Sequence, residues 1–154
     1  YLTSRSKNPG PEGDPRIWYS VTFDGERWIH TEIAHSKSNY DHGALFRSST
    51  GWDLIAPIGE GPQPYNPGGE VVVYKGDEHG LSWRFDKSLT QNSPANHCFV
   101  RRGMNAHSDF LGFWADGNPR EPGPSRLYFC DSDGGVYRLP ALMTQDWETP
   151  EKLD

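Results

Sequence analysis

The sequence predicts an all-β fold, namely about two and a half four-stranded antiparallel blades of a β-propeller. Aromatic residues make up 13% of the chain although hydrophobic residues make up only 34%, a balance that suits short strands with large flat side chains better than a helical bundle. The 17 glycines and 13 prolines supply many turns and interrupt any long helix. The third observation is a pattern that recurs about every 55 residues.

The repeat consists of a tyrosine, a glycine six residues later and an aromatic residue three positions after that glycine. It occurs three times, as Tyr19-Gly25-Trp28, Tyr74-Gly80-Trp83 and Tyr128-Gly134-Tyr137, with glycines 55 and 54 residues apart. A fixed period with turn chemistry at its centre is typical of repeat architectures. An antiparallel sandwich is the alternative, but it does not require a constant period, so we favour the propeller.

Each repeat predicts a strand, a tight turn and a second strand. The first strands are aromatic and β-branched runs at Ile17–Phe23, Glu70–Gly76 and Arg126–Asp131. The turns are Asp24-Gly25, His79-Gly80 and Asp133-Gly134, where glycine can take a positive φ. The second strands begin near Trp28, Trp83 and Tyr137.

Further strands are predicted between these hairpins, at Ala44–Arg47, Trp52–Ala56, Cys98–Arg102 and Asp109–Ala115. Only Ala141–Asp146 has a composition that could form a short helix. The chain therefore divides into a flexible lead-in (1–15), half a blade (16–35), two complete blades (36–92 and 93–146) and a tail (147–154).

The middle hairpin, from Gly76 to Trp83, resembles the Asp-box turn of sialidase-like propellers, S-x-D-x-G-x-T-W. Gly76, Glu78 and Ser82 stand where that motif has Ser, Asp and Thr. The resemblance implies a folding role, in which a carboxylate caps backbone N–H groups and the tryptophan packs between sheets.

Charge and composition narrow the range of partners. The net charge of −6 and the lack of a basic run argue against nucleic-acid binding. No stretch approaches the roughly 18 apolar residues of a membrane span. Two cysteines, Cys98 and Cys130, are too few for a disulfide scaffold. The chain begins at Tyr1 without a methionine, so we expect an upstream segment.

A propeller would place its ligand site where the innermost strands begin. That face would collect residues 39–43, 61–70, 96–97 and 115–120. Tyr65, in a loop rich in proline and glycine, is available to stack on a sugar ring. The other substrate-binding candidates are Asp41, Glu70, Asn96, Asp116 and Arg120.

Several of these residues also have a structural interpretation. His42 and His97 could be buried and bonded to backbone, and Asp41 could cap a turn. Arg101 and Arg102 are neighbours on a strand and point to opposite faces, so one of them could reach the funnel.

Metal binding is conceivable but not assigned. His97-Cys98 with His107, or His42 with His97, could bind a divalent metal such as Zn or Ca, yet no close spacing such as C-x-x-C is present. The chain has no G-x-S-x-G elbow and no P-loop, so serine and nucleotide hydrolysis are not supported.

A set of motifs between Trp18 and Pro140 resembles one known family. The motifs are Tyr40-Asp41-His42-Gly43, the loop 61–70, Asn96-His97 with Arg101-Arg102, Asn105-Ala106-His107, Trp114-Ala115-Asp116-Gly117 and the run 125–130. Together they resemble the BNR-repeat proteins of the sialidase superfamily, BNR-4 type. That family is similar to seven-bladed polysaccharide lyases such as ulvan lyases and rhamnose–glucuronate lyases.

The resemblance implies a secreted or periplasmic protein that cleaves uronate-containing glycans by β-elimination. It would place Asn96 and His97 at carboxylate neutralisation or proton transfer, and Tyr40 and His42 at proton transfer. Arg101 or Arg102 would be the anion partner. Neutralising the uronate carboxylate stabilises the enolate-like transition state, while one side chain removes the adjacent proton and another protonates the leaving oxygen.

Two other functions remain open. A glycoside hydrolase of the same superfamily needs paired carboxylates, for which Asp41, Glu70 and Asp116 are candidates. A non-catalytic sugar-binding propeller would keep Tyr65 and the loops but would not need His97. A polysaccharide or oligosaccharide is the expected partner in all three cases.

Overall fold

The computed structural model describes residues 2–3 and 9–153 and consists of three antiparallel sheets. Sheet 1 contains β1 (Leu2–Thr3), β2 (Arg16–Phe23) and β3 (Trp28–Ser36). Sheet 2 contains β4 (Ala44–Ser48), β5 (Gly51–Gly59), β6 (Glu70–Gly76) and β7 (Trp83–Ser88). Sheet 3 contains β8 (Asn96–Arg102), β9 (Gly112–Gly117), β10 (Leu127–Cys130), β11 (Val136–Arg138) and β12 (Glu151–Leu153). The predicted all-β class is confirmed.

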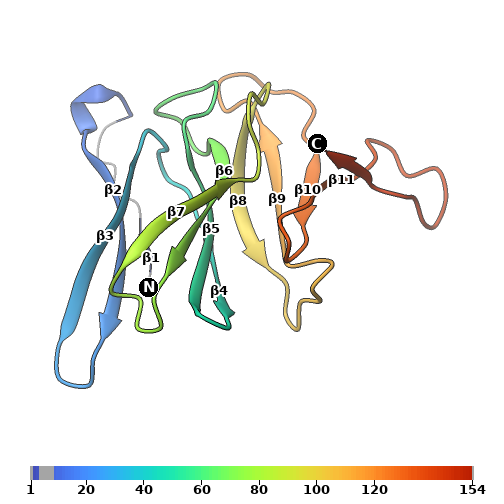
Figure 1. The fold of residues 1–154 in the computed structure, drawn as a ribbon. Helices are drawn as coiled ribbons and strands as arrows, with labels where there is room; N and C mark the ends of the chain where they lie inside the picture. Colours follow the sequence, from blue (N-terminus) through green and yellow to red (C-terminus); the bar gives the residue numbers. More distant parts are fainter. Residues whose placement is uncertain (1, 4–8, 154) are drawn as a thin grey trace.

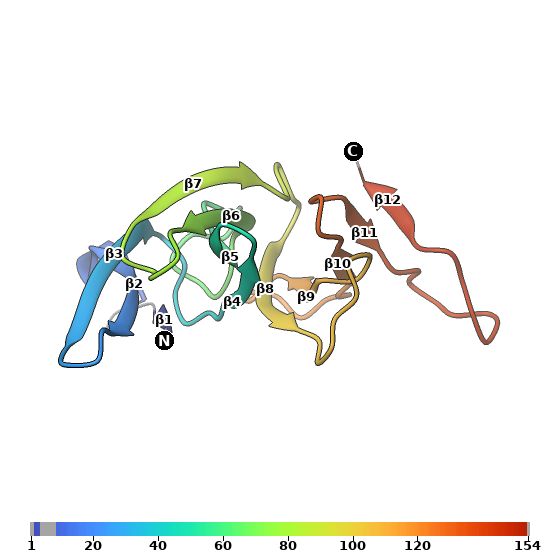
Figure 2. The ribbon, with the colours of Figure 1, turned by 60° about the horizontal axis from the view of Figure 1, so that its bottom comes forward.

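The three sheets stand side by side, and the strands of each follow one another in chain order (Figure 1). Seen toward the strand ends, the sheets fan out, with β4 and β8 close together and β7 and β12 far from each other (Figure 2). The hairpins β2–β3, β6–β7 and β10–β11 lie at one end of the sheets, the lower end in Figure 1. The segments that lead into β4 and β8 lie at the opposite end, which we call the loop end.

Two apolar layers fill the space between the sheets. Trp18 and Ile33 of sheet 1 pack against Leu54, Ala56, Ile58 and Val72 of sheet 2. On its other face, sheet 2 packs Phe46, Val71 and Val73 against Val100 and Trp114 of sheet 3. The run Val71-Val72-Val73 is therefore buried on both sides, because successive strand residues point to opposite faces.

The three predicted glycine turns are present. Gly25, Gly80 and Gly134 have φ values of 108°, 70° and 91°, which other residues rarely adopt. The aromatic residue of each repeat, however, differs in position: Trp83 pairs with Gly76 and packs at the interface of sheets 1 and 2, whereas Tyr137 pairs with Phe129. The turns differ in length, so the same sequence spacing leads to different registers.

A carboxylate caps two of these turns in the same way. Asp77 Oδ1 accepts hydrogen bonds from the N–H groups of His79 (3.0 Å) and Leu81 (2.9 Å). Asp131 Oδ1 accepts from Asp133 (3.0 Å) and Gly135 (2.7 Å). Each aspartate lies three residues before the turn glycine, so Asp77, rather than the Glu78 that the motif alignment indicates, supplies the cap.

Replacing Asp77 with alanine is therefore expected to lower the free energy of unfolding by about 1–2 kcal/mol, because two backbone donors lose their acceptor. Glu78→Ala, one position along the same exposed turn, should change it by less than about 0.5 kcal/mol. Urea denaturation of both variants checks this, and equal effects would contradict the assignment.

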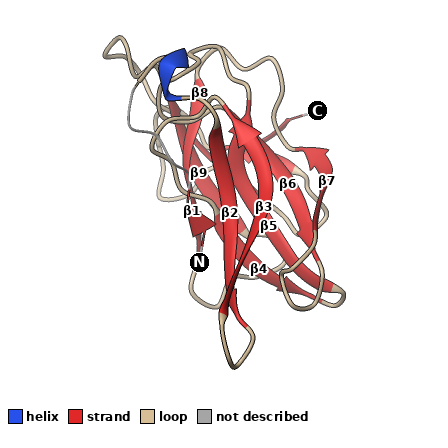
Figure 3. Cartoon of the chain, turned by 90° about the vertical axis from the view of Figure 1, so that its left-hand side faces the viewer, coloured by secondary structure: helices blue, strands red, loops and turns tan. Residues whose placement is uncertain are grey.

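The ends of the chain differ most from the sequence prediction. Sheet 1 has a third strand, β1, and sheet 3 has a fifth, β12; residues 1, 4–8 and 154, which include much of the predicted lead-in, lie outside the described part. Figure 3 shows a 3-10 turn, η1 (Pro11–Gly13), at the end of sheet 1 opposite the β2–β3 hairpin. Residues 141–146 form bends rather than a helix, because all six side chains are exposed and no buried face stabilises a helical turn.

Candidate functional site

A cluster of side chains, exposed except for one carboxylate, joins the segment just before β4 in sheet 2 to β8 in sheet 3. Asp41, just before β4, accepts hydrogen bonds at Oδ1 from the N–H groups of His42 (2.6 Å) and Phe99 (2.7 Å). Phe99 lies in β8 where the register with β9 shifts between Cys98 and Arg101. The buried carboxylate therefore fixes the start of β4 against an irregular point of β8. We call Tyr40, Asp41, His42, Phe99 and Arg101 the β4–β8 cluster.

Two aromatic residues of this cluster have an unfavourable backbone conformation. Tyr40 and Phe99 both have φ 58°, in the left-handed region that bulky residues rarely adopt. Such a conformation costs about 1–3 kcal/mol and is concentrated at functional sites. Both side chains are nevertheless exposed, by 65% for Tyr40 and 43% for Phe99. The strained backbone therefore directs these two aromatic rings to solvent and not into the core.

An imidazole and a guanidinium lie beside the Phe99 ring. The His42 ring lies 5.7 Å from it, and the Arg101 guanidinium lies 5.6 Å from its centroid. Aromatic faces pack well against the C–H faces of a sugar, and a guanidinium pairs with carboxylates. The β4–β8 cluster thus combines stacking, cationic and proton-transfer groups on one surface.

Asp41 itself is only 7% exposed. Burial raises the pKa of its carboxyl group to about 6, although the N–H groups of Phe99 and His42 and the charge of Arg101 act in the opposite direction. Burial, with the nearby Asp41, raises the pKa of the Cys98 thiol to about 12, so Cys98 stays protonated. Asp41 is a positioning residue for the exposed members of the cluster.

A second polar group is buried at the seam between sheets 2 and 3. Glu70 accepts hydrogen bonds from Thr90 Oγ1 (2.5 Å), Ser93 N (2.8 Å) and Ser93 Oγ (2.8 Å). Ser93 Oγ lies 2.9 Å from His97 Nε2, and Trp114 Nε1 donates to His97 Nδ1 at 3.0 Å. We call Glu70, Thr90, Ser93, His97 and Trp114 the seam chain.

The hydrogen positions in the seam chain follow from its donors. An indole N–H can only donate, so His97 Nδ1 must carry the lone pair and Nε2 the hydrogen. Nε2–H then donates to Ser93, whose hydroxyl donates to Glu70. Burial lowers the pKa of His97, more than Glu70 and Asp116 raise it, which keeps the ring neutral. With 3% exposure and both nitrogens engaged, His97 holds β8, β9 and the β7–β8 connection together.

Asn96 and Asp116 also organise loops. The Asn96 side chain is fully buried; its Oδ1 accepts from Gln63 N (3.1 Å), and its Nδ2 donates to the carbonyls of Gln63 and Pro67 (2.9 Å each). Asp116 accepts from Arg126 N and Tyr128 Oη, both at 2.7 Å. Burial and Asp116 raise the pKa of Tyr128 to about 12, so its hydroxyl remains a donor.

The remaining predicted site residues lie outside both groups. The Arg16 guanidinium lies 4.8 Å from the Tyr65 ring centroid, so one face of that ring is covered. Arg120 donates to the Pro64 carbonyl at 3.1 Å, and Arg102 lies over Phe46 rather than Phe99.

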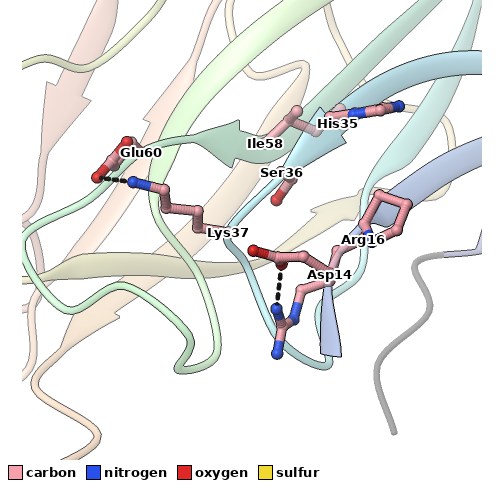
Figure 4. A pocket seen from close by; sticks show the side chains of 8 residues that line it. Asp14, Arg16, His35, Ser36, Lys37, Ile58 and Glu60 are labelled. Carbon is pink, nitrogen blue, oxygen red and sulfur yellow. Dashed lines mark hydrogen bonds and ion pairs between the residues drawn. The ribbon is translucent and has the colours of Figure 1, made fainter. Parts of the chain in front are cut away.

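Hollows that differ in volume and in lining residues lie along the seams between neighbouring sheets. A cleft of about 600 Å³ lies between sheets 2 and 3 beside the seam chain, and a second of about 550 Å³ lies on the other side of residues 91–93. A smaller hollow of about 350 Å³ lies between sheets 1 and 2 (Figure 4). Its charged side chains form the ion pairs Lys37–Glu60 (2.8 Å) and Arg16–Asp14 (2.6 Å). Each of these charges is therefore balanced by its partner in the pair.

The sequence does not indicate several members of these groups. Thr90 and Ser93 lie in the β7–β8 connection, which has no motif, and Phe99 sits in an ordinary apolar strand pattern. Trp114 belongs to the motif Trp114-Ala115-Asp116-Gly117, but the sequence does not reveal that its indole N–H donates to His97. Only the bulge and the loop packing bring these residues into contact.

Metal ligands are not gathered in the described part of the chain. Among residues 2–3 and 9–153, no group of three or more His, Cys, Asp or Glu side chains could hold a metal ion. No helix within the same residues has the length and apolar character needed to cross a bilayer.

Comparison with models of protein families, with curated proteins and with solved structures found no match for this chain.

Proposed function

We propose that the three sheets are consecutive blades of a β-propeller that acts on carbohydrate, and that its reaction is β-elimination at a uronate sugar bound at the β4–β8 cluster. The observation that carries this is the cluster itself, in which the buried Asp41 carboxylate holds the backbone of His42 and of the strained Phe99, and the Phe99 ring lies beside an imidazole and a guanidinium.

Three features support the propeller. The sheets are meanders in chain order, the glycine hairpins share one end, and the first strands of sheets 2 and 3 lie against each other (Figures 1 and 2). The outer face of sheet 3 also carries Phe110, Phe113, Phe129 and Tyr137 in a continuous series of ring contacts. A further blade would cover these rings as sheet 3 covers sheet 2.

In the proposed reaction, Arg101 neutralises the substrate carboxylate and so stabilises the negative charge that develops when the adjacent proton leaves. His42 and Tyr40 flank Asp41 in the chain and are both exposed. One removes the proton and the other protonates the departing glycosidic oxygen. Asp41 takes no proton from the substrate; it holds the backbone that presents these groups. A polysaccharide substrate agrees with a secreted or periplasmic location.

The neighbouring arginines provide a matched test. Arg101→Ala should lower the rate of elimination by about 100-fold, because the carboxylate loses its cation. Arg102→Ala should leave the rate within about 2-fold, since Arg102 lies over Phe46 and outside the cluster. The assay incubates the protein with uronate-containing polysaccharides and follows the ultraviolet absorbance of the unsaturated sugar. New reducing ends without that absorbance would indicate hydrolysis and contradict the proposal.

A non-catalytic sugar-binding propeller is the second candidate. It is favoured by the seam chain, because Asn96 and His97 are buried with their hydrogen-bonding groups engaged and so serve to shape loops. Binding of uronate glycans with no product of either kind would select this candidate.

A further inference from the structure

The cleft of about 600 Å³ between sheets 2 and 3 has a lining unlike that of the β4–β8 cluster. Its polar side chains include Gln91, Asn92, Ser93, His97, Tyr128 and Arg138, and its apolar side chains include Leu89, Pro94 and Val136. None of the described lining residues is a carboxylate. The lining therefore consists of amide, hydroxyl, imidazole and guanidinium groups around a few apolar side chains.

Arg138 is the charged side chain of the described lining, and its charge is balanced by a carboxylate outside the lining. His97 is held uncharged because Trp114 donates to its Nδ1. The charge of Arg138 is balanced by Glu151, whose Oε2 lies 2.6 Å from Arg138 Nη2. A guanidinium has five N–H donors, so Arg138 can hold Glu151 and donate to a ligand at the same time. A charged ligand would lose its hydration here without gaining an opposite free charge.

The wall of the cleft is preformed. Glu70 binds the Thr90 hydroxyl and both the N–H and the hydroxyl of Ser93, which fixes the β7–β8 connection from behind. Tyr128 is held by Asp116 on the opposite wall. Asn92, between the exposed Gln91 and the fixed Ser93, has a left-handed backbone (φ 54°). A preformed site loses little conformational freedom when a ligand binds.

From this lining we infer that the cleft binds a neutral sugar unit, separately from the β4–β8 cluster, with Gln91 and Arg138 as hydrogen-bonding partners. Amide and hydroxyl groups both donate and accept, which matches the hydroxyl groups of a sugar, while Leu89 and Val136 contact its C–H face. The inference rests on the proposed function only in the choice of a carbohydrate as ligand. It would give the protein one site for the uronate and another for a neutral sugar of the same polymer.

The test titrates the isotopically labelled protein with a panel of neutral disaccharides and with glucuronate. Binding is monitored through the amide chemical shifts. Neutral sugars should shift the signals of Gln91, Asn92, Gly134 and Gly135, which line the cleft. Gln91→Ala should weaken binding about 5-fold and Arg138→Gln about 10-fold. Gln145→Ala, an exposed glutamine outside the cleft, is the matched control and should bind as the unmodified protein does.

Three results would overturn the inference: shifts in the cleft with glucuronate only, no shift with any neutral sugar of the panel, or unchanged binding in both Gln91→Ala and Arg138→Gln. Failure of the proposed function can be distinguished from failure of this inference. It would appear as a lack of elimination activity and as a lack of any effect of Arg101→Ala. A protein without elimination activity that still binds neutral sugars in the cleft would retain this inference.

Discussion

Replacing Glu70 with alanine is expected to lower the free energy of unfolding by about 3–5 kcal/mol. The change leaves the N–H and hydroxyl of Ser93 and the hydroxyl of Thr90 without their acceptor. Each buried donor that loses its partner costs about 1–3 kcal/mol. Since domains are stable by only about 5–15 kcal/mol, the loss would be visible as a large shift of the urea midpoint.

Glu60→Ala is the matched control for this experiment. Glu60 lies ten residues earlier, is exposed, and forms a surface ion pair with Lys37. Such pairs contribute less than about 1 kcal/mol. Similar losses for the two variants would contradict the view that Glu70 organises the β7–β8 connection.

Replacing Asp41 with asparagine is expected to stabilise the protein at pH 8 and to have little effect at pH 4. In the folded state the pKa of Asp41 is raised from 3.8 to about 6, mainly by burial. Between these two values the folded state binds more protons than the unfolded state, so stability falls as the pH rises from about 4 to about 6. Asparagine keeps an oxygen that can accept from Phe99 and His42, but it does not ionise.

The shift of roughly two pKa units corresponds to about 3 kcal/mol at pH 8. Urea denaturation of both proteins at pH 4 and pH 8 measures it. Asp146→Asn, at an exposed position, should follow the unmodified protein at both pH values. An Asp41→Asn variant with the same pH dependence as the unmodified protein would show that Asp41 is not the group responsible.

Local chemistry in the sequence was enough to predict most of the strands. Aromatic and β-branched runs mark β2 and β6, and the turn glycines mark the ends of the hairpins, because only a positive φ closes them. The short strand β12 was missed, since Glu151–Leu153 has no pattern of its own and becomes a strand by pairing with β11. The sequence motif places the cap of the middle hairpin at Glu78, one residue too late, because Asp77 and Glu78 both supply carboxylates and only the backbone geometry separates them.

The candidate site was predictable in part. The predicted strand order places Tyr40, Asp41 and His42 directly before β4, at the loop end, whereas Arg101 lies in the second half of β8. The division of the predicted residues into an exposed cluster and a buried seam chain was not predictable, because it depends on side-chain burial. Phe99 illustrates the limit: its exposure follows from a bulge in β8 that no local sequence signal marks.

The most direct test of the proposed site is to map where a uronate oligosaccharide binds, by amide chemical shifts of the labelled protein. Binding at the β4–β8 cluster predicts that the largest shifts fall on Tyr40, His42, Phe99 and Arg101, while Gly25 and Gly80 at the hairpin end stay unchanged. Shifts concentrated at the hairpin end, or none within the β4–β8 cluster, would contradict it.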